Sequence, residues 1–211
     1  MPAGRESDER TAMTKENEDR RLVKAVLTGS CRDFEELVRR HERLVRHIVM
    51  PMAGSVEDGE DLLQDVFMKV YAHLGTFRFE SKLSTWIGNI AFNAATHHRA
   101  MRLREKGGGT GTLEVVPGLP DRGPGRPDIE ATPDEAPSPV ETLVRAEERR
   151  RLREAVMLLP EIQRSILLLF HQDEQTLGEI GAMLELPVNT VKSHLFRARR
   201  KLKELLLRQE E

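Results

Sequence analysis

Residues 176–202 read TLGEIGAMLELPVNTVKSHLFRARRKL, and two helical patterns meet within them at a sharp break. In the first pattern the small residue Gly181 stands beside the apolar Ile180. The second pattern begins at Pro187, which suits a first helical turn because the N–H that proline lacks would have no partner there. Its apolar residues recur at helical spacing at Val191, Leu195, Ala198 and Leu202. The stretch therefore predicts a helix-turn-helix.

The opposite face of the second helix is polar and basic, since residues 187–208 carry seven Lys and Arg against one Glu, a net charge of +6. In a helix-turn-helix the second helix enters the DNA major groove, where polar side chains read base edges and arginines hold phosphates. The predicted contacts are Asn189, Thr190, Lys192, Ser193, His194 and Arg197, followed by Arg199, Arg200 and Lys203 toward phosphates. On these residues alone, a solvated charged face remains the alternative.

The composition is that of a soluble protein with a core. Of 211 residues, 38 % are hydrophobic and 32 % charged, and the net charge of −2 averages over the basic end and an acidic stretch at 107–139, which carries −4. The single cysteine, Cys31, excludes an intrachain disulfide and offers no cysteine-based zinc site. Because no apolar run reaches membrane-spanning length and no signal-peptide core is present, we expect a cytoplasmic protein without membrane insertion.

Helical periodicity without strand alternation predicts an all-α fold along the rest of the chain. Residues 1–18 are polar and aperiodic, and we expect a disordered tail. Residues 19–105 form the first predicted domain. Its predicted helical segments are 22–27, 34–51, 55–75 with Ser55 as the N-cap, and 85 to about 104. Pro51 is expected to end the second of these helices.

The stretch 106–139 is rich in Gly and Pro and cannot repay the entropy of ordering by itself, so it is predicted to be a flexible linker. Helical patterns resume over 140–159 and 161–172, separated by Pro160, and lead into the helix-turn-helix. The prediction is thus two small helical domains, 19–105 and 140–211, joined by an acidic linker.

Four segments in this order resemble the extracytoplasmic-function (ECF, group IV) sigma factors of bacterial RNA polymerase, within the sigma-70 family. They are DLLQDVFMKVY at 61–71, TFRFESKLSTWIGNIAFN at 76–93, LLPEIQRSILLL at 158–169 and IGAMLELPVNTVKSHLFRARRKL at 180–202. The resemblance implies a region 2-like and a region 4-like domain. It also implies a protein that binds core RNA polymerase, directs it to promoter DNA through −35 and −10 elements, and assists promoter opening.

The segment 61–71 is implied to bind the clamp helices of the largest polymerase subunit, with Asp61, Gln64 and Asp65 as contacts for basic side chains. Acids near a helix start also favour the positive end of the helix macrodipole. A solvated, well-capped helix start is therefore the alternative. The resemblance further implies control by an anti-sigma factor that covers the polymerase-binding surfaces.

The loop 76–84 and the helix after it are implied to hold an unstacked base of the −10 element. Aromatic and basic side chains can repay the cost of unstacking through stacking and phosphate contacts. The matching residues are Phe77, Arg78, Phe79, Glu80, Ser81 and Lys82 in the loop, with Asn89 and Asn93 on the helix. Trp86, at helical spacing with Ile90, is expected in the core instead.

Some positions depart from the family pattern. Phe79 stands where a glycine is common, and Asn89 and Phe92 occupy positions that are often arginine, so this helix is less basic on its DNA side. Glu185 replaces the glycine usual at the helix-turn-helix turn. Because glycine adopts a positive φ far more readily than glutamate, we expect a strained or differently shaped turn.

An enzyme and a one-component DNA-binding regulator are the two alternative functions. The seven histidines form no H-x-x-x-H pair, and the glycine-rich GGGTG at 107–111 has no strand before it, so we expect no enzyme, catalytic residue, metal or cofactor. A one-component regulator that binds DNA without polymerase is the stronger rival, although it would not need the 61–71 segment or the Trp86 segment. Whether the linker enters polymerase channels or is a passive tether stays open.

Overall fold

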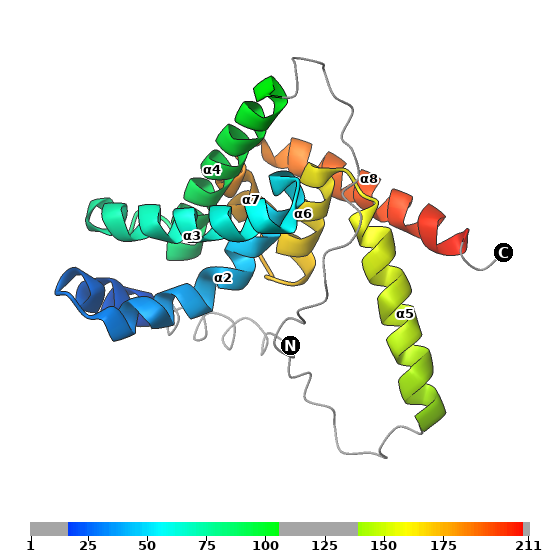
Figure 1. The fold of residues 1–211 in the computed structure, drawn as a ribbon, viewed down its shortest axis with the longest axis horizontal. Helices are drawn as coiled ribbons and strands as arrows, with labels where there is room; N and C mark the ends of the chain where they lie inside the picture. The colour runs from blue at the N-terminus through cyan, green and yellow to red at the C-terminus, as the bar shows by residue number, and fades with distance from the viewer. Residues whose placement is uncertain (1–16, 106–138, 209–211) are drawn as a thin grey trace, which may run out of the picture.

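The computed structural model describes residues 17–105 and 139–208, and the regular elements within these ranges are all helical (Figure 1). The all-α prediction is confirmed. The first helix covers 17–27, followed by α2 (Cys31–Ala53), α3 (Val56–His73), a 3-10 turn η1 (Leu74–Thr76), α4 (Leu83–Glu105), α5 (Pro139–Met157), α6 (Glu161–His171), α7 (Leu177–Met183) and α8 (Val188–Leu207). The predicted tail and linker lie almost entirely outside the described residues.

The N-terminal domain packs the helix at 17–27 and α2 to α4 around one apolar core. Its fully buried side chains include Leu37 and Ile48 of α2, Val66 of α3 and Ile87 of α4. Each such side chain contributes about 1.5–3 kcal/mol through burial. Trp86 packs half-buried against this core with its ring 5.3 Å from that of Phe77, as its spacing predicted.

Side-chain caps set where two of these helices begin. The Ser30 hydroxyl accepts a hydrogen bond from the backbone N–H of Asp33 at 3.3 Å, so α2 starts three residues before the predicted Phe34. The Ser55 hydroxyl accepts from the N–H of Asp58 at 3.0 Å, which confirms the predicted cap of α3.

The prediction that Pro51 ends its helix is wrong, because α2 continues through it to Ala53. A proline removes the hydrogen bond of its own nitrogen, and here only two further residues follow before the helix stops. Gly54, with a φ of 97°, supplies the actual end. The Arg102 guanidinium donates to the carbonyl of Ala53 and satisfies this terminus from α4.

The C-terminal domain consists of α5 to α8. Thr176 and Glu179 form a reciprocal capping box that starts α7. A Cβ on Gly181 would lie 2.8 Å from the carbonyl oxygen of Leu186, so the small residue lets the chain after the turn pass close to α7. Pro187 is the N-cap of α8, and the helix begins at Val188, whereas the sequence pattern predicted that the helix begins at Pro187 itself.

The two domains pack against each other, although the sequence pattern predicts only a flexible connection between them. Helix α6 lies against α2, and α7 lies against α4. Gly88 of α4 makes the close approach possible, since a Cβ there would stand 2.7 Å from Cγ of Met183. Met183 of α7 is fully buried, so the apolar core runs from one domain into the other.

Within 17–105 and 139–208, no helix is both long and apolar enough to cross a membrane. The same residues hold no group of three or more His, Cys, Asp or Glu side chains placed to bind a metal ion. Cys31 is exposed at the start of α2.

Candidate nucleic-acid and polymerase interfaces

Helix α8 has one side buried against the C-terminal domain and the opposite side exposed. Val191 and Ala198 are fully buried, whereas Lys192 and Arg197 are exposed. The Ser193 hydroxyl donates to the carbonyl of Asn189 at 2.9 Å, and Arg197 Nε donates to the carbonyl of Ser193 at 3.2 Å. These contacts hold the polar side chains along a single rigid helix whose exposed face can enter a groove.

His194 is half-buried on this helix, and its Nδ1 has no hydrogen-bond partner among the described residues. Burial, and next the charge of Arg197, lowers the pKa of His194. The ring is therefore neutral at pH 7 and offers a donor and an acceptor rather than a charge.

Arg199 is held by its own domain. Its guanidinium lies 5.3 Å from the centroid of the Phe170 ring, and Nη2 lies 3.1 Å from Nε2 of His171. Burial, and next Arg199 itself, lowers the pKa of His171, so the neutral ring can accept this hydrogen bond. Arg200 lies 3.7 Å from the Glu204 carboxylate, and Lys203 is exposed. A phosphate would meet an oriented Arg199 and two more adaptable cations.

Phe196, which is not among the predicted DNA contacts, has an exposed fraction of 68 %. It stands one helical turn after Lys192 on the basic face of α8. The signal was available in the sequence, because an aromatic residue outside the apolar stripe has no core to enter. On a groove-facing helix, an apolar side chain can contact the methyl group of thymine.

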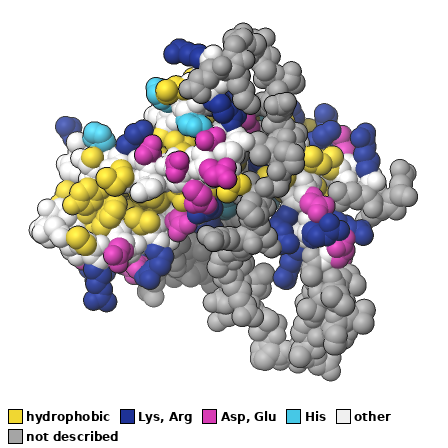
Figure 2. All heavy atoms as spheres, in the orientation of Figure 1, with side chains coloured by type: hydrophobic (Ala, Val, Ile, Leu, Met, Phe, Trp, Pro, Cys, Tyr) yellow, Lys and Arg dark blue, Asp and Glu magenta, His cyan; other side chains and the backbone are white. Residues whose placement is uncertain are grey.

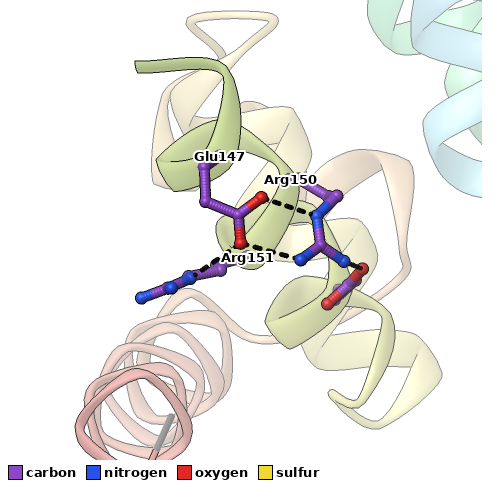
Figure 3. Close-up of polar contacts among 4 residues, drawn as sticks. Glu147, Arg150 and Arg151 are labelled. Carbon is purple, nitrogen blue, oxygen red and sulfur yellow. Dashed lines mark hydrogen bonds and ion pairs between the residues drawn. The ribbon is translucent and has the colours of Figure 1, made fainter. Parts of the chain in front are cut away.

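Two arginines of α5, Arg150 and Arg151, are paired with acids on the same helix. Glu147 accepts hydrogen bonds from Arg150 and Arg151, and Arg150 also donates to Glu154 (Figure 3). These bonds, those from Arg150 first, lower the pKa of Glu147 to about 2. The net charge is +1 over 139–157 on α5, from five Arg and four Glu, against +6 over 187–208 on α8.

The loop before α4 is anchored by its aromatic residues. Phe77 is only 8 % exposed and packs against Phe79 at 4.7 Å between ring centroids, so it supports the loop from the core and is not free to stack on a base. Phe79 adopts a φ of 58°, which explains why a glycine is common there. The Arg20 guanidinium lies 4.6 Å from its ring centroid. The exposed loop side chains are Arg78, Glu80, Ser81 and Lys82.

Three of the predicted −10 residues contact the C-terminal domain. Lys82 Nζ lies 2.5 Å from the Glu179 carboxylate. Nδ2 of Asn89 and Nδ2 of Asn93 donate to the same oxygen, Oε1 of Glu185, at 3.1 and 3.2 Å. Glu185 has a φ of 54°, so the strained turn expected at this position is present.

The outer face of α3 carries both acidic and apolar side chains. Asp61, Gln64 and Asp65 are exposed. Met68 and Tyr71, which lie within the implied polymerase-binding segment 61–71, follow on the same helix with exposed fractions of 61 % and 51 %. Figure 2 shows hydrophobic side chains gathered where α3 ends and α2 begins, with acidic side chains beside them toward the middle of the molecule. Such a combination is typical of a protein-binding surface.

Comparison with known proteins matches both domains. Residues 37–105 match the family Sigma-70 region 2, and residues 149–202 match Sigma-70, region 4. The ECF RNA polymerase sigma factor SigW of Bacillus subtilis is 27 % identical over 89 % of this chain and 96 % of that protein. The chain belongs to the ECF sigma factors of the sigma-70 family. The RNA polymerase sigma-H factor of Pseudomonas aeruginosa is 28 % identical to this sigma factor, over 92 % and 96 % of the two chains.

A solved structure of the sigma factor RpoE from Bartonella quintana, in complex with the anti-sigma factor NepR, has the same fold, with a TM-score of 0.59. It is 23 % identical, and the match covers 82 % of this chain and 96 % of that one. As a sigma factor, the protein directs RNA polymerase to promoters. A regulator that acts without polymerase is not favoured, since the region 2 domain would then have no purpose.

Proposed function

We propose that α8 reads the −35 element as duplex DNA. Its exposed basic face, set against a fully buried apolar side, is the observation that carries this assignment. The residues toward base edges are Asn189, Thr190, Lys192, Ser193, His194, Phe196 and Arg197, and those toward phosphates are Arg199, Arg200 and Lys203. The neutral His194 and the oriented Arg199 support this division.

The −10 element is bound by the loop before α4 and by α4 itself. Arg78, Phe79, Glu80, Ser81 and Lys82 form the loop part of this face, with Asn89 and Asn93 on the helix. Phe79, held half-buried between Arg20 and Phe77, supports the loop, and Phe77 acts from the core. The absence of arginine at Asn89 and Phe92 favours contacts with bases over contacts with phosphates.

Core polymerase binds the outer face of α3. Asp61, Gln64 and Asp65 pair with basic side chains of the clamp helices, while Met68 and Tyr71 supply apolar contact area beside them. The polymerase performs all chemistry, and the sigma factor works where the polymerase does, in the cytoplasm. An anti-sigma factor controls the protein by covering these surfaces, in keeping with the RpoE–NepR complex.

Transcription with purified core polymerase tests the assignment. The sigma factor should start transcripts from genomic fragments that share two upstream elements, and core polymerase alone should not. If it binds duplex DNA specifically but never associates with core polymerase, the residue assignments on α3 fail.

Arg197→Ala should weaken binding to the −35 element by about tenfold, since a specific side-chain contact with a base is worth about 1–3 kcal/mol. Competition between −35 variants shows which kind of contact is lost. A base contact relaxes the preference at one position, and a phosphate contact lowers affinity equally on all sequences. Arg150→Ala on α5, where the arginine is paired with acids, is the matched control. Equal promoter activity in Arg197→Ala would remove this residue from the site.

A further inference from the structure

The Arg199 side chain leaves α8 at the border between its buried and its exposed side. Arg199 follows Leu195 by one helical turn, and Leu195 is buried in the core. Helix α6 packs against α8. Arg199 is nevertheless exposed, so its guanidinium is in contact with both the end of α6 and the solvent.

Two ring side chains at the end of α6 hold this guanidinium. Phe170 packs half-buried against the core, and its ring centroid lies 5.3 Å from the guanidinium carbon of Arg199. His171, the last residue of α6, has its Nε2 3.1 Å from Nη2 of Arg199. The two rings meet edge to face, with centroids 5.1 Å apart. Each of the three side chains therefore contacts the other two, and Phe170 anchors the cluster to the core.

The hydrogen bond between His171 and Arg199 leaves the charge of the arginine intact. A guanidinium carries only donors, so Nε2 of His171 accepts and the ring proton lies on Nδ1. Burial, and next the charge of Arg199, lowers the pKa of His171, which keeps the ring neutral at pH 7. A neutral acceptor orients the guanidinium without cancelling its positive charge, and the other N–H groups of the guanidinium stay available.

Other arginines of this domain have anionic partners. Arg150 pairs with Glu147 at 2.7 Å, and Arg200 lies 3.7 Å from the Glu204 carboxylate. A carboxylate attracts a guanidinium as a phosphate does, so DNA has to displace it before it can use the arginine. In its contact with the end of α6, Arg199 meets an aromatic ring and a neutral nitrogen instead.

Orientation before binding matters for an arginine. Its long side chain loses rotamer freedom when it docks on a phosphate, and this loss lowers the affinity. Where contacts within the protein already restrict the side chain, less freedom is lost on binding. Because Phe170, His171 and Arg199 all belong to the C-terminal domain, this restriction does not depend on where the N-terminal domain lies.

We propose that His171, supported by Phe170, is a positioning residue of the −35 site, which holds Arg199 ready for a DNA phosphate through a neutral acceptor. The proposal rests on the assignment of Arg199 to a phosphate above. It adds the end of α6, outside the helix-turn-helix, to the parts of the protein that set the affinity for promoter DNA. Because a phosphate contact carries no sequence information, the effect should be equal on all −35 sequences.

Titration of a promoter fragment, found in the transcription experiment above, with the reconstituted holoenzyme tests the positioning role. His171→Leu removes the acceptor and leaves the net charge at pH 7.5 unchanged. It should weaken promoter binding about fivefold, as expected for the loss of one hydrogen bond. His171→Gln, whose side-chain oxygen is a neutral acceptor, should restore most of the affinity. Gln172→Leu, at the exposed neighbouring position, is the matched control.

A carboxylate at position 171 separates orientation from charge. His171→Glu supplies an acceptor but also an anion beside Arg199, so it should weaken promoter binding at least as much as His171→Leu. A role limited to holding the fold predicts the opposite, since a charged pair would fasten α6 to α8 at least as well as the neutral contact does.

A double-mutant cycle shows whether His171 acts through Arg199. Arg199→Gln should weaken binding and reduce the slope of log affinity against log salt concentration by about 0.9, the value for one phosphate contact. In this background His171→Leu should cause no further loss. Because His171 is exposed, the fold should survive each change, and urea unfolding of every variant checks this.

The outcomes separate this proposal from the function proposed above. If Arg199→Gln weakens binding but His171→Leu does not, or if His171→Glu binds as tightly as the wild type, the positioning role is wrong and the phosphate contact stands. Equal losses from His171→Leu with and without Arg199→Gln would also overturn it. If Arg199→Gln changes neither the affinity nor the salt slope, the phosphate assignment fails, and the positioning role fails with it.

Discussion

His41 is an ionisable residue buried in the apolar core of the N-terminal domain. Its side chain is 8 % exposed within the N-terminal domain, and its Nε2 has no hydrogen-bond partner among the described residues. Burial, and next the charge of Arg40, lowers the pKa of His41 from 6.5 to about 4. The folded domain therefore holds a neutral ring, while the unfolded chain takes up a proton below pH 6.5.

The stability of the protein should consequently fall as the pH drops from 6.5 toward 4, because the unfolded state then binds the extra proton. Between pH 7 and 4.5 the wild type should lose about 2–3 kcal/mol more than His41→Leu, at about 1.4 kcal/mol per pKa unit. Urea unfolding at several pH values measures the difference. The exposed His97→Leu is the control, and parallel pH profiles for wild type and His41→Leu would contradict the assignment.

Phe196 is the other residue whose position calls for a function. If its exposed ring contacts a thymine methyl, Phe196→Ala should weaken binding to a −35 duplex by about 1 kcal/mol, roughly fivefold. Replacing that thymine by uracil, which lacks the methyl group, should reproduce the loss in the wild type and add little in the variant. Titration of fluorescent duplexes measures both. Independent, additive losses would place Phe196 away from the base.

At the scale of single elements, the turn between α7 and α8 is the informative one. Gly181 is required by the close carbonyl of Leu186, but Glu185 adopts a conformation that favours glycine. The helix-turn-helix therefore has a glycine at position 181, where space is limited, and a glutamate at position 185, where the backbone conformation favours glycine.

Glu185→Gly should make the chain about 1 kcal/mol more stable to unfolding than Glu185→Ala, since both remove the carboxylate and only glycine removes the strain of the left-handed conformation. Denaturant unfolding of the two variants side by side isolates the backbone effect. Equal stabilities would mean that the turn relaxes to another conformation once the carboxylate is gone.

At the scale of the whole molecule, the contact between α4 and α7 decides the shape. Gly88→Leu should separate the domains, because even a Cβ at this position would approach Met183 to 2.7 Å. X-ray scattering in solution should then show a larger radius of gyration than for the wild type, with the helix content in circular dichroism unchanged. Gly178→Leu, where a Cβ would meet no atom within 4 Å, is the control. An unchanged radius for Gly88→Leu would show that the interface absorbs the side chain.

The sequence by itself determined the helices, the two domains matched by the sigma-70 regions, and the separation of a buried from a basic side in α8. Periodicity, caps and charge act over a few residues, so they are visible in the sequence. It also located the strained Glu185, because glycine preference is a property of one residue.

Only the tertiary structure decided the rest. It buried Phe77, carried α2 past Pro51 with the help of Arg102, and exposed Met68 beside the acids of α3. It also brought Glu179 and Glu185 onto residues nearly one hundred positions earlier in the chain. Such contacts depend on how two apolar surfaces fit together, and no local pattern in the sequence records that fit.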